Sequence, residues 1–443
     1  MHKFGGASLA DSAAVRHAVD IIRRHRPEPT VVVVSAMAGT TDALLGVAQQ
    51  AGSGESRPVT SLIARLRSRH AEVARALLPA GPARADLLAY VSDVFEELEA
   101  LAQGLRLLRE LTPRTTDYLI SRGERLSARL VAAALEASGV KTKYVDALDL
   151  VHTDGAFGQA APDFPRTDRC VQRVLAPLLA RGIVPIVPGF IGATPEGETA
   201  TLGRGGSDLT ATLLARGLSA ARVSLWKDVP GLLTADPRVV PEARVIPQLH
   251  AREAAELAYY GAKVLHPRAL IPLAGRRIPI YVRPFADPAA AGTEVSERVA
   301  PARFPVKALT AAGGQALVTV TGSGMLGVPG IAARTFASLH ARQISVSLIS
   351  QASSEHSICF SVPDTLATEA QESLEREFKG EISRGEIDGV EVSPAMATVA
   401  VVGLGMHGTP GVAAGVFSAL AAGKINVVAI AQGSSELNIS VVV

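Results

Sequence analysis

The first 300 residues alternate short apolar, mostly β-branched runs with longer stretches rich in alanine and leucine. Four runs are continuous enough to predict strands buried on both faces of a parallel sheet: residues 31–35, 183–188, 222–226 and 278–282. Between them, apolar residues recur at helical spacing in residues 11–25, 91–111 and 122–137. This alternation predicts an α/β sandwich with a mostly parallel central sheet.

Residues 53–115 interrupt that alternation with a long, mostly helical pattern. Prolines at position 58 and between positions 79 and 82 divide it into pieces. We expect this segment to be an insertion that lies over one edge of the sheet.

An internal repeat follows a linker-like segment at residues 299–305 (VAPARFP). Residues 316–362 align without gaps to residues 397–443, with 23 of the 47 aligned positions identical. Each copy has the pattern strand, glycine turn, helix, strand, strand, and a further helix follows the first copy at residues 365–378. The repeat predicts two ferredoxin-like βαββαβ units after a domain at residues 1–300, at residues 308–380 and 395–443.

The second copy stops where its counterpart of the closing helix would begin. A sheet without its covering helix would expose an apolar face, which proteins in water avoid. We therefore expect the natural chain to continue past residue 443.

Composition narrows the class of protein. Hydrophobic residues make up 48% and charged residues 19%, which excludes global disorder. The net charge is +2 without a basic tract, so nothing favours nucleic-acid binding. Two cysteines are too few for a disulfide framework, and no Cys/His spacing resembles a zinc site. With no leader and no apolar run of about 20 residues, we expect a soluble cytoplasmic protein with no membrane partner.

Two glycine-rich motifs carry candidate chemistry, and both have a plainer interpretation. In KFGGAS, Lys3 precedes a glycine pair and a predicted helix. This motif is either a phosphate-binding loop or a glycine turn with a solvated lysine. In GRGGSD, Arg204 suits a carboxylate, and Asp208 could hold a metal–nucleotide or orient a catalytic lysine. Otherwise, Ser207 or Asp208 would cap the following helix.

The chain has only eight lysines, which makes those inside motifs informative. Lys227 and Lys263 lie beside turn residues after apolar runs, where they would line a nucleotide cleft or belong to structural turns. The loop at residues 35–41 could bind a small polar substrate, while Glu124 taken alone is a solvated helix charge. The first 300 residues contain neither a P-loop nor a dinucleotide-binding GxGxxG motif.

The order of six motifs resembles that of the aspartate kinase family: KFGGAS, SAMAGTTD, SRGERLSA, TLGRGGSD, WKDVPGLLTADPR and YGAKVLHP. The repeat resembles the paired ACT-type regulatory domains of that family. The stretches GMLGVPGIAARTF, SLISQASSEHSI and VVAIAQGSSELNISVVV resemble the aspartokinase portion of bifunctional aspartokinase–homoserine dehydrogenases, in which a dehydrogenase follows.

The resemblance implies transfer of the ATP γ-phosphoryl to L-aspartate, with Mg²⁺, giving 4-phospho-L-aspartate. It implies catalytic roles for Lys3 and Asp208, and no metal-binding side-chain motif. The implied aspartate-binding residues are Ser35, Thr41, Glu124, Arg204 and Ser207. The implied nucleotide-binding residues are Lys3, Gly5, Gly6, Ser8, Lys227, Asp228, Leu233, Arg238, Lys263 and Val264. The chain departs from the family at three positions. Ala7 and Lys227 stand where the family often has Thr, and Leu233 stands where it often has Tyr.

For the repeats, the resemblance implies feedback inhibition by threonine first and lysine second, in a homodimer or larger homo-oligomer. The implied effector-binding residues are Ile349, Gln351, Ile430 and Gln432. The repeats could instead be dimerisation scaffolds alone. Two other functions are a kinase for another amino acid, such as glutamate, and a non-catalytic amino-acid sensor. The motif combination argues against the first, and the intact Lys3, Arg204 and Asp208 argue against the second.

Overall fold

The computed structural model describes residues 1–260, 264–298, 304–326, 328–351 and 356–443. Lys263, the linker residues 299–303, and repeat positions 327 and 352–355 therefore lie outside the described residues. The chain divides into two compact units. The first comprises Met1–Leu232, Val245–Ala251 and Val264–Val299, and the second comprises Leu233–Arg244, Arg252–Lys263 and Ala300–Val443.

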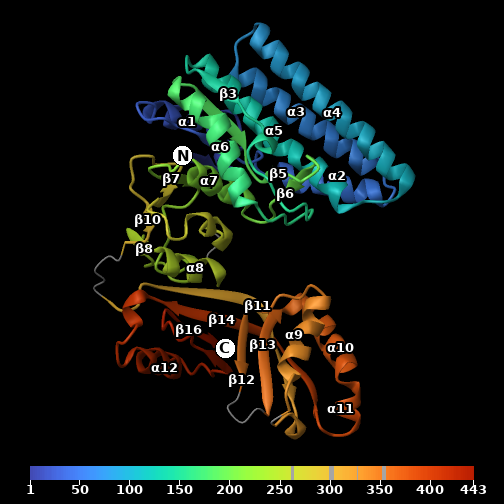
Figure 1. Cartoon of the computed structure of the whole chain (residues 1–443), viewed down its shortest axis with the longest axis vertical. Coiled ribbons are helices and arrows are strands. Elements are labelled where there is room, and N and C mark those ends of the chain that lie inside the picture. The colour runs from blue at the N-terminus through green and yellow to red at the C-terminus, as the bar shows by residue number, and fades with distance from the viewer. Residues whose placement is uncertain (261–263, 299–303, 327, 352–355) are drawn as a thin grey trace. The chain divides into compact units, whose positions relative to one another are not determined.

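An eight-stranded sheet forms the centre of the first unit (Figure 1), with the strand order β3-β4-β2-β1-β7-β9-β10-β8. Within this order, the neighbouring strands β3, β4, β2, β1, β7 and β9 are parallel to one another, whereas β10 is antiparallel to β9. The predicted mostly parallel sheet is therefore confirmed. Their bounds are β1 His2–Phe4, β2 Val32–Val34, β3 Thr142–Tyr144, β4 Val184–Pro188, β7 Val223–Lys227, β8 Gln248–His250, β9 Ile280–Pro284 and β10 Thr293–Ser296. All four predicted strands are present, although β9 begins two residues later than expected.

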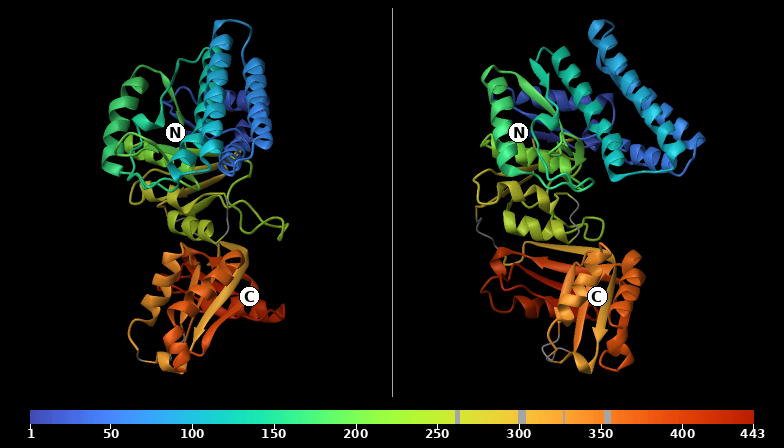
Figure 2. Two further views of the ribbon diagram at one scale, coloured as in Figure 1. Left: turned by 90° about the vertical axis from the view of Figure 1, so that its right-hand side faces the viewer. Right: turned by 45° about the vertical axis from the view of Figure 1, so that its right-hand side comes forward.

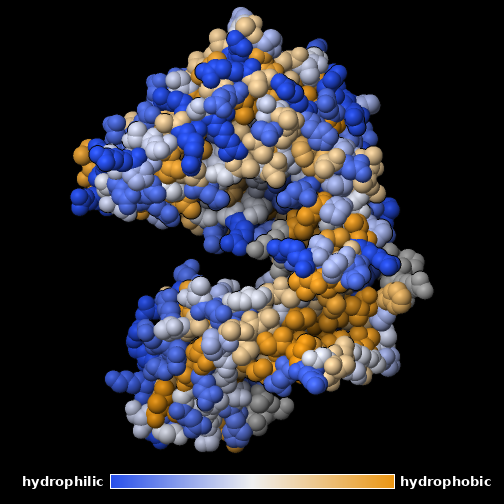
Figure 3. All heavy atoms as spheres, turned by 180° about the vertical axis from the view of Figure 1, so that it is seen from behind, coloured by the Kyte–Doolittle hydropathy of each residue, from blue (hydrophilic) through white to orange (hydrophobic). Residues whose placement is uncertain are grey.

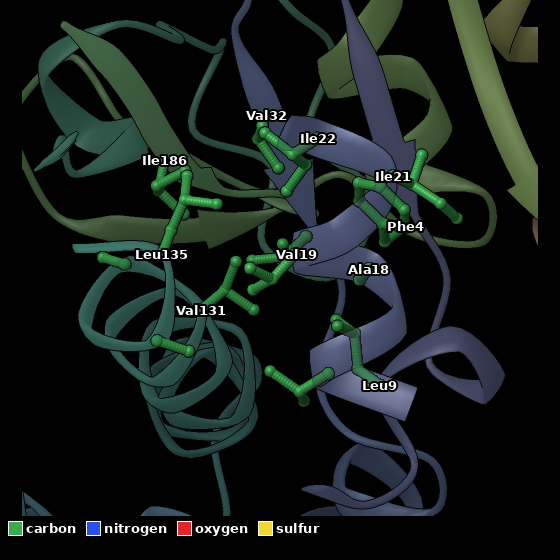
Figure 4. Packing of buried hydrophobic residues seen from close by; sticks show 14 of the residues in the cluster. Phe4, Leu9, Ala18, Val19, Ile21, Ile22, Val32, Val131, Leu135 and Ile186 are labelled. Atoms are coloured by element: carbon green, nitrogen blue, oxygen red, sulfur yellow. The ribbon is translucent and has the colours of Figure 1, made fainter. Parts of the chain in front are cut away.

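Helices α1 (Ser12–Arg24) and α5 (Pro113–Ala137) pack against the sheet through one apolar cluster, shown in Figure 4. Phe4, Val32 and Ile186 contribute to this cluster from three neighbouring strands. The Asp11 side chain caps α1 by accepting a hydrogen bond from the Ala14 backbone N–H, which explains where that helix begins. The remaining elements of this unit are α2 Thr40–Gly52, α6 Phe164–Ala180, α7 Gly206–Gly217 and the hairpin of β5 Ile191–Ala193 with β6 Thr199–Thr201.

The insertion folds into a helical hairpin of α3 (Arg57–Leu77) and α4 (Pro82–Leu108), as Figure 2 shows. Its helical character is confirmed, but its expected place over an edge of the sheet is wrong. Its apolar side chains form a cluster with α2 and α5, so it packs on helices. Pro58 and Pro82 lie in the first turns of the two helices, where a missing N–H costs nothing, and therefore begin helices rather than interrupt them.

The second unit contains a six-stranded antiparallel sheet in the order β12-β13-β11-β14-β16-β15. The repeat is confirmed, since α9 and α12 begin at equivalent positions of the two copies. The bounds are β11 Ala308–Thr321, α9 Ile331–Ala341, β12 Leu348–Gln351, β13 Ser357–Pro363, α10 Ala367–Glu377, α11 Lys379–Ser383, β14 Gly389–Val402, α12 Val412–Ala422, β15 Ala429–Ala431 and β16 Asn438–Val442.

The two long strands β11 and β14 are shared between the repeats, which the sequence pattern did not predict. The second half of β11 pairs with β13 of the first copy, and the second half of β14 pairs with β16 of the second. The two strands also pair with each other, from Ala308 opposite Val402 to Thr321 opposite Gly389. The two units of the repeat are therefore one continuous sheet.

Helix α12 is apolar in sequence, yet none of its residues is fully buried. Phe417 and Leu420 are among its partly buried side chains, and Figure 3 shows a broad apolar area on this unit.

The second unit also includes α8 (Ala251–Tyr259) apart from its first residue, and a preceding loop. Glu253 of α8 is fully buried, contacts Lys307 at 2.9 Å and accepts a hydrogen bond from Leu404 N at 2.8 Å. The compact units thus do not divide at a single point near residue 300, and the predicted domain limits stay a prediction. None of the described helices combines the length and apolarity needed to cross a bilayer.

Candidate active site

The alternation of side chains along β1 places Lys3 in the candidate site. Phe4 faces the apolar cluster with α1 and α5, so its neighbour Lys3 points to the opposite face of the sheet. On that face, helix α7 carries Asp208, and Lys3 Nζ lies 2.7 Å from Asp208 Oδ1. Both side chains are about 6% exposed, so this ion pair is buried.

A second lysine binds the same carboxylate. Lys227, the last residue of the neighbouring strand β7, donates a hydrogen bond from Nζ to Asp208 Oδ2 at 2.7 Å. Burial opposes ionisation of Asp208, but the two lysines outweigh it and lower its pKa to about 2. Burial also lowers the pKa of Lys3, although Asp208 offsets part of that effect. We call Lys3, Asp208 and Lys227 the lysine–aspartate cluster.

Asp208 therefore orients lysines, as one of the two sequence interpretations proposed. The alternative capping role is wrong, because Gly205 is the N-cap residue of α7 and receives no side-chain cap. Gly205 has φ +75°, and a Cβ there would lie 2.4 Å from the His266 side chain. Only glycine fits this approach, which brings the GRGGSD loop against His266.

The KFGGAS motif forms a tight turn at the carboxyl end of β1. A Cβ at Gly6 would lie 3.0 Å from the Ala36 carbonyl oxygen, so this glycine allows two loops to approach. The backbone N–H groups of Gly6 and Ala7 donate to no hydrogen bond among the described residues, so they are available to an anion. The buried Ser8 hydroxyl donates to the Trp226 carbonyl oxygen at 3.4 Å.

Arg204 is exposed in the loop before α7, and no described carboxylate pairs with it. Ser207 is buried in the first turn of α7, while Ser35 and Thr41 are half-buried after β2 and at the start of α2. Because parallel strands end at one edge of a sheet, the loops after β1, β2 and β7 gather there. Ser35 and Thr41 thus lie at that edge, while Arg204 and Ser207 belong to the loop after β6 and to the first turn of α7.

Glu124 lies on α5 and is 3% exposed, so the interpretation as a solvated helix charge is wrong. Its Oε2 atom has no hydrogen-bond partner among the described residues. Burial raises the pKa of Glu124 to about 8. Hydrogen bonds from backbone N–H groups and the charge of Lys3 lower the pKa but do not outweigh burial. The unused Oε2 atom of this buried side chain leaves room for one further hydrogen bond.

This pKa predicts a pH dependence of stability. The folded protein binds the Glu124 proton more tightly than the unfolded chain, so the free energy of unfolding falls as pH rises from about 4.5 to about 8. Glu124→Gln should remove this contribution, with a slope of at most about 1.4 kcal/mol per pH unit. Urea unfolding at a series of pH values measures it. Glu136→Gln, at an exposed site on the same helix, is the control. The same pH dependence of the free energy of unfolding in the wild type and in Glu124→Gln would contradict the prediction.

Three positioning residues were missed by the sequence analysis. Asp117 accepts hydrogen bonds from Thr201 N at 2.8 Å and Oγ1 at 2.7 Å, just before the GRGGSD loop. Arg268 donates to the Leu202 carbonyl oxygen at 2.6 Å in the same segment. Arg69 of α3 donates to the carbonyl oxygens of Ala38 at 2.7 Å and Ala10 at 2.8 Å, which links the loops after β2 and β1. Arg268 directly follows the YGAKVLHP motif, whereas nothing in the local sequence around Asp117 or Arg69 marks them.

Some predicted nucleotide residues are not part of the cluster. Asp228 is exposed, and Val264 is half-buried in the first unit. Leu233 and Arg238 belong to the second unit, where Arg238 pairs with Asp236 at 2.7 Å. Their roles, and that of Lys263 outside the described residues, stay predictions.

The second unit contains a separate cavity of about 310 Å³ next to α9. Gln351 lines it together with Met325, Gly330 and Ile358. Ile349 and Ile430 lie at equivalent positions of the two repeats and are 51% and 46% exposed, and Gln432 is exposed as well. Of the four predicted effector residues, Gln351 is the one that lines this cavity.

Comparisons with known proteins agree with this geometry. The amino acid kinase family matches residues 1–284, and the ACT domain matches residues 318–378 and 399–443. Lysine-sensitive aspartokinase 3 of Escherichia coli is 36% identical over 99% of this chain and 94% of its own length. The crystal structure of E. coli aspartokinase III in complex with aspartate and ADP has a TM-score of 0.86, at 33% identity, over 100% of this chain and 95% of that one.

The chain therefore belongs to the amino acid kinase family. Within it, the chain belongs to the aspartokinases, with ACT regulatory domains. The chloroplastic bifunctional aspartokinase/homoserine dehydrogenase 1 of Arabidopsis thaliana is 35% identical over the whole of this chain and 49% of its own length. The chain thus spans about half the length of the bifunctional relatives it matches.

Proposed function

We propose that this chain is an aspartate kinase, which transfers the γ-phosphoryl group of ATP to the side-chain carboxylate of L-aspartate. The observation that carries this proposal is the buried lysine–aspartate cluster at the carboxyl ends of β1 and β7, with Arg204 exposed on the loop before α7 and paired with no described carboxylate. The cluster supplies positive charge for phosphates, and Arg204 supplies a fork for a carboxylate. E. coli aspartokinase III, which this chain resembles, binds aspartate and ADP.

The chemistry needs charge neutralisation and alignment more than proton transfer. The attacking carboxylate is ionised at neutral pH, so no general base is required. Both reactants are anionic, and Lys3 and Lys227 would offset their repulsion at the transferred group. Asp208 keeps the two ammonium groups in place, and the free N–H groups of the KFGGAS turn add further donors.

Mg²⁺ would arrive as part of the ATP substrate and neutralise phosphate charge. Both Asp208 oxygens are already within 2.7 Å of a lysine, which suits a lysine-holding role better than a metal ligand. The described residues contain no group of three or more acidic, histidine or cysteine side chains that could form a protein cage for a metal. A Mg²⁺ ion held mainly by the phosphates of the nucleotide would fit these residues.

A hydroxamate assay tests the proposal, because hydroxylamine traps the acyl phosphate product. We expect ATP-dependent hydroxamate with L-aspartate and only background with L-glutamate or without amino acid. Equal signals with glutamate would support a kinase for a different amino acid. No signal with any substrate would support a non-catalytic sensor.

We further propose that the Gln351 cavity binds a feedback inhibitor, with threonine the first choice and lysine the second. A cavity of about 310 Å³ suits one amino acid, and the Gln351 amide can bind its polar groups. The relative from E. coli is named lysine-sensitive, which keeps lysine as an alternative.

Gln351→Ala should raise the half-inhibitory concentration of the effective amino acid by about tenfold or more, since hydrogen bonds to charged groups contribute about 1.5–3 kcal/mol. Titration of kinase activity with threonine and with lysine measures this. Gln371→Ala, on α10 of the same unit, is the control. A lack of inhibition by both amino acids in the wild type would favour the scaffold interpretation of the repeats.

A further inference from the structure

Helix α5 holds strand β6 at two points. The buried Asp117 carboxylate accepts hydrogen bonds from Thr201 N at 2.8 Å and from Thr201 Oγ1 at 2.7 Å. About two turns further along the helix, the buried Arg125 guanidinium donates to Thr199 Oγ1 at 3.3 Å. We call these four residues the α5–β6 clamp. Because all four side chains are buried, water does not compete for their hydrogen bonds.

The Arg125 arm of the clamp is fixed on its own side. Arg125 Nε pairs with Asp146 at 2.9 Å, and another guanidinium nitrogen of Arg125 donates to Ser121 Oγ at 2.8 Å. Asp146 also accepts hydrogen bonds from the Tyr144 hydroxyl at 2.8 Å and from Leu148 N at 3.1 Å. The guanidinium is therefore held by α5 and by the segment that follows β3, and it reaches Thr199 from a fixed position.

The loop that carries Arg204 is short and anchored at both ends. Leu202 at its start is fully buried, and Gly206 is the first residue of α7. Only Gly203, Arg204 and Gly205 lie between them. The two glycines have φ angles of +71° and +75°, so the chain turns sharply on either side of Arg204. A three-residue loop has little slack, so a shift of β6 would move Arg204 relative to α7 and the lysine–aspartate cluster.

The distance between Arg204 and the cluster matters for the proposed reaction. One carboxylate of the substrate would pair with the Arg204 guanidinium, while the carboxylate that accepts the phosphoryl group would lie at the cluster. Aspartate and glutamate differ by one methylene group between their two carboxylates. A small misplacement of a positioning group can lower the rate about a hundredfold, so the position of Arg204 discriminates between these lengths.

We propose that the α5–β6 clamp determines substrate length, because it fixes the distance between Arg204 and the lysine–aspartate cluster for a four-carbon dicarboxylic amino acid. This inference rests on the proposed function and adds its specificity. Asp117 and Arg125 bind β6 and act through Arg204, so they are positioning residues rather than catalytic ones.

Replacing the two threonines loosens the clamp without removing a buried charge. Thr201→Val removes the hydroxyl but keeps the backbone N–H that donates to Asp117, and Thr199→Val removes the acceptor of Arg125. The test is the ratio of kcat/KM for L-aspartate to kcat/KM for L-glutamate, measured on the full chain at high enzyme concentration. One methylene group is worth about 10- to 200-fold in such a ratio, so the double variant should lower it at least about tenfold. KM for ATP should stay unchanged.

Two further variants separate positioning from a general loss of stability. Thr201→Ser keeps the hydroxyl and should keep the wild-type ratio. Thr335→Val removes an equally buried hydroxyl, which donates to the Ile331 carbonyl oxygen within α9 at 2.9 Å, and should also keep the wild-type ratio.

The outcomes distinguish this inference from the proposed function. A wild type that is inactive with aspartate would contradict the kinase function itself. An active wild type whose double variant keeps the ratio, or loses activity with both amino acids in the same proportion, would overturn the role of the clamp and leave the kinase function intact.

Discussion

Lys3→Met is expected to lower kcat by about a hundred- to a thousandfold, the usual effect of removing one preorganised charge donor from a transition state. The ammonium group lies on a buried strand and is fixed 2.7 Å from Asp208 Oδ1, so it needs no reorganisation when phosphoryl transfer builds up charge. Methionine has a similar length and can pack in the same space. Lys227 still neutralises Asp208 in the variant, which removes the main reason for the fold to fail.

Steady-state kinetics of the hydroxamate assay, with thermal unfolding in parallel, measures this effect. Lys143→Met, an exposed lysine on β3, is the matched control and should keep wild-type kcat. A Lys3→Met enzyme with near wild-type kcat and an unchanged melting temperature would remove Lys3 from the catalytic role. A low kcat together with a large drop in melting temperature would be tested again with Lys3→Arg.

The fold was predictable where periodicity is local. Continuous apolar runs identified β2, β4, β7 and β9, because strands buried on both faces carry no polar alternation. The gapless repeat identified α9 and α12. The placement of the α3–α4 hairpin was missed, because an amphipathic helix does not reveal whether its apolar face meets a sheet or other helices. The pairing of β11 with β14 was missed for a related reason, since the sequence of one strand does not specify which strand it pairs with.

Residues of the candidate site could be picked out from the sequence where a motif carries unusual chemistry. Lys3, Arg204 and Asp208 stand out in a chain with few lysines and in glycine-rich loops. Asp117 and Arg69 do not, because their importance comes from carbonyl and N–H groups that lie far away in sequence. Glu124 was placed by family resemblance, and only its burial explains why a helix carboxylate has a pKa of about 8. Residues that position a loop through its backbone groups therefore cannot be identified from sequence motifs.

Arg204→Ala is expected to raise KM for L-aspartate by about ten- to a hundredfold and to leave KM for ATP nearly unchanged. The guanidinium is exposed on the loop before α7 with no described carboxylate partner, so it is free to pair with the substrate. Charge-assisted hydrogen bonds contribute about 1.5–3 kcal/mol, which corresponds to this range. Removing an exposed side chain should not change stability, because Asp117 and Arg268 hold the loop independently.

Arg204→Lys separates charge from geometry in this prediction. Lysine keeps the positive charge but loses the planar fork, so KM for aspartate should fall between the values for the wild type and for alanine. Arg181→Ala, an exposed arginine at the end of α6, serves as the control. A rise in KM for ATP with unchanged KM for aspartate would assign Arg204 to the nucleotide instead, and the lysine–aspartate cluster would then need a different residue to hold the substrate carboxylate beside it.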